Sequence, residues 1–186
     1  MVQMTKQNSQ LVVGYPTERI DPLRLIAHLP IQPYHELADF RCGSGHLTIP
    51  LAKHLFSGKV YASDPDSQAL KELKGKVAAT HLGNVVILTE KQQKSIRQDT
   101  LDGALMAFTL SSVKDREAPL KSVLRLLKRG AWLAVLEWHD KKTTEGPPVS
   151  QRIGEDTVVD LARKVGFRFS QKRNLDGLHY LMILRK

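Results

Sequence analysis

The fold is decided by the stretch Leu37-Ala38-Asp39-Phe40-Arg41-Cys42-Gly43-Ser44-Gly45. Residues 36–40 read as a short apolar strand, two glycines follow, and Leu47, Leu51 and Leu55 then recur at helical spacing. Glycines at such a turn let the backbone bend sharply and approach a ligand, and the helix that follows offers free N–H groups. The motif therefore predicts a strand, a glycine turn and a helix, with a ligand site at the carboxyl end of the first strand.

The same alternation continues along the chain. Further strands are predicted at residues 59–63, 84–88, 103–108, 132–137, 167–172 and 180–184. Leucine and valine spacing predicts helices after the second strand, before Gly130 and before Gly166, the two glycines serving as helix stops. The last two strands have no helix between them and should pair as a hairpin. Five β/α steps with a terminal hairpin predict a mostly parallel sheet, covered on both faces, with one antiparallel strand.

Length and composition limit the class of protein. The chain has 186 residues, 41% of them apolar and 25% charged, which fits one soluble domain at residues 16–186 after a loose tail at 1–15. No apolar run approaches the roughly 20 residues that span a bilayer, so neither membrane insertion nor a signal peptide is expected. The single cysteine, Cys42, excludes a disulfide framework and a cysteine-rich zinc site. We expect a cytoplasmic protein without a metal site.

The net charge of +9 is unevenly distributed. Residues 1–93 carry 10 basic and 8 acidic side chains, whereas residues 94–186 carry 18 and 11. The basic residues that cluster in the second half are Lys121, Arg125, Lys128, Arg129, Arg163, Lys164, Arg168, Lys172 and Arg173. The first four are predicted on a helix that leads into the fifth strand, which places them at the amino edge of the sheet, away from the ligand. We therefore expect no specific nucleic-acid partner and only weak, salt-sensitive binding.

Two acidic residues indicate what the glycine turn binds. Asp64 stands nineteen positions beyond Gly45 at the tip of the second strand, where a carboxylate can accept both ribose hydroxyls, although capping of the next helix is an alternative role. Thr48 occupies the place of the third glycine in a dinucleotide fingerprint, which weakens the prediction of NAD. Asp39, just before the turn, would repel a pyrophosphate but could hold a cationic amino group. These features favour a sulfonium amino-acid nucleoside.

The chain resembles class I S-adenosylmethionine-dependent methyltransferases. The resemblance is carried by the glycine turn, by Val60-Tyr61-Ala62-Ser63-Asp64, by the stretch 102–108 and by Gly146-Pro147-Pro148. In particular, the chain is similar to the small type 11 and ubiquinone/menaquinone-biosynthesis group. The resemblance implies a Rossmann-like αβα sandwich with strand order 3-2-1-4-5-7-6 and S-adenosylmethionine as cofactor. It also implies that Gly43, Ser44 and Gly45 line the methionine part, that Asp64 binds the ribose, and that Ala107 and Phe108 face the cofactor.

The chain departs from this family at two places. The family usually has glycine where this chain has Arg41, whose guanidinium could either clamp the cofactor carboxylate or crowd the turn. After the third strand, where the family often places an acidic residue that holds the adenine amino group, the chain reads Thr89-Glu90-Lys91-Gln92. Glu90 serves there if the register shifts by one.

The acceptor is less defined by sequence. Methyl transfer from a sulfonium is an in-line displacement that needs alignment of donor and acceptor in a dry pocket, with a base optional. His46 and His139 are the candidates for a base or a substrate contact, whereas His179 is interpreted as a packing residue. No Asn/Asp-Pro-Pro-Tyr run follows the fourth strand, which disfavours amino methylation of bases, so we expect a small-molecule acceptor. The alternatives are a nicotinamide-dependent oxidoreductase, an RNA methyltransferase and a non-catalytic nucleoside-binding domain. Homodimerisation stays open.

Overall fold

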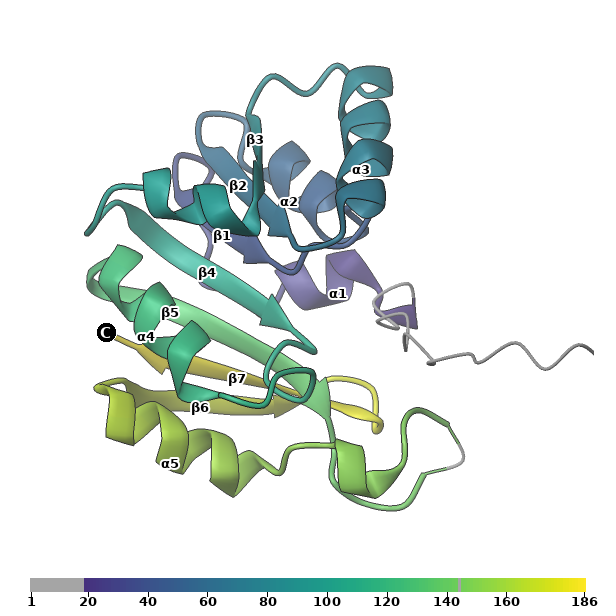
Figure 1. Ribbon diagram of the computed structural model, residues 1–186, viewed down its shortest axis with the longest axis vertical. Helices are drawn as coiled ribbons and strands as arrows, with labels where there is room; N and C mark the ends of the chain where they lie inside the picture. The colour runs from purple at the N-terminus through teal and green to yellow at the C-terminus, as the bar shows by residue number, and fades with distance from the viewer. Residues whose placement is uncertain (1–18, 144) are drawn as a thin grey trace, which may run out of the picture.

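The computed structural model describes residues 19–143 and 145–186, so the expected tail at 1–15 lies outside the described residues. Figure 1 shows strands that alternate with helices along most of the chain. The elements are α1 (Pro22–Ile26), β1 (Glu36–Phe40), α2 (Thr48–His54), β2 (Lys59–Asp64), α3 (Ser67–Ala79), β3 (Val85–Thr89), the 3₁₀ helix η2 (Glu90–Ser95), β4 (Leu101–Ala107), α4 (Glu117–Leu126), β5 (Leu127–Trp138), the 3₁₀ helix η3 (Val149–Gln151), α5 (Glu155–Val165), β6 (Arg168–Asn174) and β7 (His179–Arg185).

The seven strands form one sheet of order β3-β2-β1-β4-β5-β7-β6. β1 pairs in parallel with β2 and β4, while β7 runs antiparallel to both β5 and β6. The predicted fold class and strand order are therefore confirmed. Because strand order reverses between β1 and β4, the crevice at their carboxyl ends is the expected ligand position in an open α/β sheet.

Helices cover both faces of the sheet, as expected from their apolar stripes (Figure 1). α4 buries Leu120, Val123 and Leu126 against one face, which it shares with α5. α1, α2 and α3 cover the opposite face, where Leu51 and Leu73 are fully buried. None of the helices within the described ranges is long and apolar enough to cross a membrane.

The helix before β5 is shorter than its pattern predicts. α4 ends at Leu126, and β5 begins at Leu127, which pairs with Leu101 of β4. The prediction of Gly130 as the helix stop was therefore wrong, because this glycine lies inside β5 with a φ of +79°. Pairing with β4 overrides the local helical periodicity, so Lys128 also lies on a strand rather than on the helix.

The connection between β3 and β4 carries a 3₁₀ helix in place of a full α-helix. Gln92 Oε1 accepts hydrogen bonds from the backbone N–H of Thr89 at 2.9 Å and from its hydroxyl at 3.0 Å, which fixes the start of η2. The prediction of five regular β/α steps is therefore incorrect at this step. The short helix leaves open space over β1 and β4, between η2 and α4.

Candidate functional site

The glycine turn follows β1 and is tied to the end of β2. The backbone N–H groups of Arg41 and Cys42 both donate to the carbonyl of Ser63, at 2.7 and 3.1 Å. Gly43 and Gly45 have φ angles of +53° and +87°, a backbone region that residues other than glycine rarely adopt. The turn thus has the conformation that the glycines predicted, at the point where strand order reverses.

Asp64 joins the end of β2 to this turn. Its Oδ2 accepts the N–H of Gly43 and its Oδ1 accepts the N–H of Asp66, both at 2.8 Å. The side chain is buried, with 5% of the residue exposed. An ionised carboxylate has about four acceptor positions, so these two bonds leave capacity for hydroxyl donors of a ligand. The structure places Asp64 beside the glycines as expected, and it adds the structural role of bracing the turn.

Asp39 lies fully buried beneath the turn. The Thr48 hydroxyl donates to its Oδ2 at 2.7 Å. The pKa of Asp39 is raised to about 7, mainly by burial and to a smaller extent by the nearby Asp64, while the Thr48 hydrogen bond opposes the rise. A cation bound above the turn would favour the ionised form of Asp39. Burial likewise raises the pKa of Cys42, which makes this thiol unreactive.

Arg41 has a left-handed backbone, with a φ of +61°, and its side chain leaves the glycine turn. Its Nη1 donates to the Ser112 hydroxyl, at 2.9 Å, in the segment after β4. Arg41 also lines a cavity on the α4 side of the sheet. The side chain thus contacts another element, and the carboxylate clamp and the crowding of the turn both stay predictions.

This cavity has a volume of about 420 Å³ and lies between η2 and α4. Phe40, Met106 and Val123 form an apolar floor. The charged side chains around it are Arg41, Glu90, Lys94, Asp115 and Arg125. Its size is within the usual range for small-molecule sites, and an apolar floor is typical of them. Glu90, predicted from the sequence as an adenine contact, thus lies at the cavity, although the cavity does not extend to Asp64.

The end of β4 is held by a buried carboxylate that the sequence analysis did not identify. Glu137 of β5 accepts the N–H groups of Leu110 and Ser111, at 2.8 and 3.1 Å, and the Ser111 hydroxyl at 2.7 Å. Burial raises the pKa of Glu137 to about 7, against the effect of these hydrogen bonds. The segment after β4 is therefore fixed from β5.

Ala107 ends β4 and Phe108 follows it, at the same edge of the sheet as the glycine turn. Both residues are 2% exposed, and the Phe108 ring packs against the rings of Trp138 and His179, with centroids 6.2 and 5.4 Å away. Phe108 has a φ of +52°. The Phe108 side chain thus belongs to the core here, and its contact with a cofactor stays a prediction.

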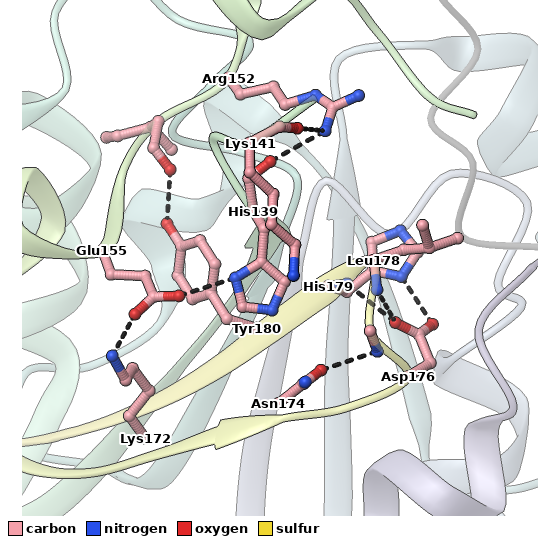
Figure 2. A network of polar contacts seen from close by, with 12 residues as sticks. His139, Lys141, Arg152, Glu155, Lys172, Asn174, Asp176, Leu178, His179 and Tyr180 are labelled. Carbon is pink, nitrogen blue, oxygen red and sulfur yellow. Dashed lines mark hydrogen bonds and ion pairs between the residues drawn. The ribbon is translucent and has the colours of Figure 1, made fainter. Parts of the chain in front are cut away.

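The two candidate histidines make structural contacts. His46 Nε2 lies 2.8 Å from the carbonyl oxygen of Ile20, which ties the turn before α2 to the segment before α1. His139 Nδ1 lies 2.7 Å from Glu155, which also pairs with Lys172, as Figure 2 shows. Neither histidine has a contact that would identify it as a base, so a catalytic role for either stays a prediction.

Arg152 organises the loop after β5 and was missed by sequence reasoning. Its guanidinium donates to the carbonyls of residues 139, 141, 145 and 147 and to the Thr143 hydroxyl, at 2.8–2.9 Å. Figure 2 shows it bridging the start of this loop beside His139. His179 of β7 pairs with Trp138 of β5, and its Nδ1 lies 2.7 Å from Asp176 Oδ2. The only local signal for this network was the Gly-Pro-Pro run, which predicted a loop but not the arginine that anchors it.

Arg125 lines the cavity beside Glu90, so the prediction that the basic helix residues lie away from the candidate site is wrong for Arg125. Lys128 stands near the start of β5, the end remote from the glycine turn, and pairs with Asp102 at 2.6 Å. Glu117 pairs with both Lys121 and Lys164. These pairs neutralise part of the basic face, and the absence of a specific nucleic-acid partner stays a prediction.

Comparisons with known proteins agree with this geometry. A family described as "Methyltransferase domain" matches residues 38–133, which run from β1 into β5. The 2-phytyl-1,4-naphtoquinone methyltransferase of Trichormus variabilis is 27% identical over 140 residues, covering 74% of this chain and 61% of that protein. The demethylmenaquinone methyltransferase of Lactiplantibacillus plantarum is 28% identical over 129 residues, covering 68% of this chain and 54% of that protein.

Among solved structures, a SAM-dependent methyltransferase from Aquifex aeolicus superposes with a TM-score of 0.84 over 91% of each chain. At 24% identity this similarity establishes the fold. The curated relatives are longer, and this chain spans about 60% of the length of the first of them.

Proposed function

Because this chain belongs to the methyltransferase domain family, we propose that it transfers the methyl group of S-adenosylmethionine to a small-molecule acceptor. The observation that carries the proposal is the glycine turn braced by Asp64, with Gly43 N–H and Asp64 Oδ2 2.8 Å apart. This arrangement places a carboxylate and a partly exposed turn backbone together at the point where strand order reverses.

The residues present fit such a donor. A Cβ built on Gly43 meets no atom within 4 Å, so the space in front of the turn is open to a ligand. Gly43 and Ser44 would hold the amino-acid part, and Asp64 would accept the ribose hydroxyls. The cavity of about 420 Å³ beside Glu90 would hold the base.

When bound, S-adenosylmethionine supplies an electrophilic methyl group on a sulfonium. The protein's part is to orient the donor and the acceptor and to exclude water. The buried Asp39 adds negative potential beneath a positively charged donor. Glu137 holds the segment after β4 in place, which fixes one wall of the site.

The acceptor we propose is an aromatic ring of the quinol type. Two relatives are named for methylation of a naphthoquinone and of demethylmenaquinone. A carbon of an electron-rich ring would form the new C–C bond as the methyl–sulfur bond breaks, and the ring proton would pass to solvent or to a protein base.

Titration calorimetry tests the proposal with S-adenosylhomocysteine and, separately, NADH. We expect binding of S-adenosylhomocysteine, weakened roughly tenfold to hundredfold by Asp64→Asn, because a charged acceptor of buried hydroxyls contributes about 1.5–3 kcal/mol. Asp66→Asn, which changes an exposed carboxylate two residues away, is the matched control.

Three outcomes contradict the proposal. Binding of NADH alone would favour an oxidoreductase, and binding of neither ligand would favour a non-catalytic domain. Transfer of labelled methyl groups into RNA, but not into a reduced naphthoquinone, would favour an RNA methyltransferase.

A further inference from the structure

We infer that Lys76 recognises the α-carboxylate at the amino-acid end of the methyl donor, an inference that rests on the proposed function. Lys76 belongs to α3, outside the glycine motif, yet its Nζ lies 2.9 Å from the Ser44 carbonyl oxygen and 2.8 Å from the Ser44 hydroxyl. An ammonium group is thus fixed on the middle residue of the Gly-Ser-Gly turn.

Packing of α3 against the turn places this lysine. A Cβ on Gly45 would lie 2.3 Å from Leu73 Cδ1, so the leucine occupies the space that the glycine leaves free. Leu73 is fully buried, which fixes the position of α3. Lys76 follows three residues later on the same helical face, and helical side chains tilt toward the helix N-terminus. Because α3 begins just after the carboxyl end of β2, this tilt directs Lys76 toward the ligand edge of the sheet.

Electrostatics at the turn call for a cation. The buried carboxylates Asp39 and Asp64 lie beside the turn and suit the ammonium group of an amino acid, but they repel its carboxylate. Arg41, the cation that the sequence suggested, reaches Ser112 and the cavity on the α4 side instead. Lys76, by contrast, is a cation that the structure holds on the turn through its bonds to Ser44.

The donor capacity of the ammonium matches this role. A lysine ammonium has three N–H donors and no acceptor. The carbonyl and the hydroxyl of Ser44 take two of them. The third can bind a carboxylate oxygen while the other two keep the side chain oriented. Lys76 is exposed, so we expect a contribution the size of a surface ion pair, roughly threefold to fivefold in affinity.

The test compares two ligands that differ only in the carboxylate. Calorimetry would measure the binding of S-adenosylmethionine and of decarboxylated S-adenosylmethionine to the wild-type protein, Lys76→Met and Lys74→Met. Lys74 is exposed on the same helix and controls for loss of one positive charge. We expect Lys76→Met to weaken the binding of S-adenosylmethionine roughly threefold to fivefold and to leave the affinity for the decarboxylated ligand unchanged. Lys74→Met should change neither affinity.

A second variant separates charge from positioning. Lys76→Gln keeps a donor for Ser44 but loses the charge, so we expect it to lose as much affinity for S-adenosylmethionine as Lys76→Met. Wild-type affinity in Lys76→Gln, or an equal loss for both ligands in Lys76→Met, would mean that Lys76 only holds Ser44, and would overturn the inference. If the wild-type protein bound neither ligand, the proposed function itself would be wrong.

Discussion

Replacing Asp39 with asparagine should change how the stability of the ligand-free protein depends on pH. Asp39 is 1% exposed, and the Thr48 hydroxyl is its hydrogen-bond donor. Burial raises its pKa from 3.8 to about 7, so the folded protein holds this proton over a range in which the unfolded chain has lost it. The free energy of unfolding therefore falls as pH rises from about 4 to about 7, and it is level above that range.

The magnitude follows from the two pKa values. Each pH unit between them corresponds to 1.36 kcal/mol, so Asp39 lowers stability by roughly 4 kcal/mol over the whole range and by about 2.5 kcal/mol between pH 5 and pH 8. Asparagine does not titrate. The stability of Asp39→Asn relative to wild type should therefore rise by about 2.5 kcal/mol from pH 5 to pH 8, whatever constant cost the amide itself brings.

Urea unfolding at pH 5, 6, 7 and 8 measures this difference, provided that the m-values stay equal. Asp66→Asn, an exposed substitution, should run parallel to wild type throughout. Glu137, whose pKa is also raised to about 7, contributes its own slope to every one of these proteins and cancels in the comparison. Parallel curves for Asp39→Asn and wild type would refute the reasoning, because Asp39 would then ionise in the folded protein as it does in the unfolded chain.

Three further predictions concern the turn, the loop after β5 and the cavity. Gly45→Ala should lower the free energy of unfolding by about 1–3 kcal/mol, and Gly43→Ala by about 1 kcal/mol. Both glycines have positive φ, but of the two only Gly45 would place a Cβ against a buried leucine. Urea unfolding compares the two variants, and equal losses of stability would contradict the packing argument. Arg152→Met removes the five hydrogen bonds of a buried guanidinium and should lower the free energy of unfolding by roughly 2–4 kcal/mol. It should also expose residues 140–147 to limited proteolysis, and an unchanged cleavage pattern would mean that the loop keeps its conformation without Arg152. Arg41→Gly should weaken the binding of S-adenosylhomocysteine and of 5′-methylthioadenosine by the same factor in calorimetry, because Arg41 lines the cavity and not the amino-acid end. A loss of affinity confined to S-adenosylhomocysteine would restore Arg41 as the carboxylate clamp.

Local signals in the sequence were enough to predict the strands and the place of the ligand edge, whereas the strand order came from the resemblance to the methyltransferase family. Apolar runs bounded by glycines mark the strands, and the absence of a helical pattern between the last two strands marks the hairpin. The Gly43-Ser44-Gly45 turn and Asp64 lie where these signals placed them, because both depend on residues directly at strand ends. Such features are determined by the backbone preferences of a few neighbouring residues.

Interactions between distant segments were not predictable in the same way. β5 begins at Leu127 because Leu101 pairs with it, although the local pattern favoured continued helix. The direction of Arg41 depends on Ser112, 71 residues away, and the position of Lys76 depends on how Leu73 packs against Gly45. The raised pKa of Asp39 requires complete burial, which only the assembled core provides. The sequence by itself therefore determined the order of the elements along the chain and the strand ends that meet at the ligand edge. The tertiary structure decided which charged side chains reach that edge, because packing and burial act between residues far apart in the chain.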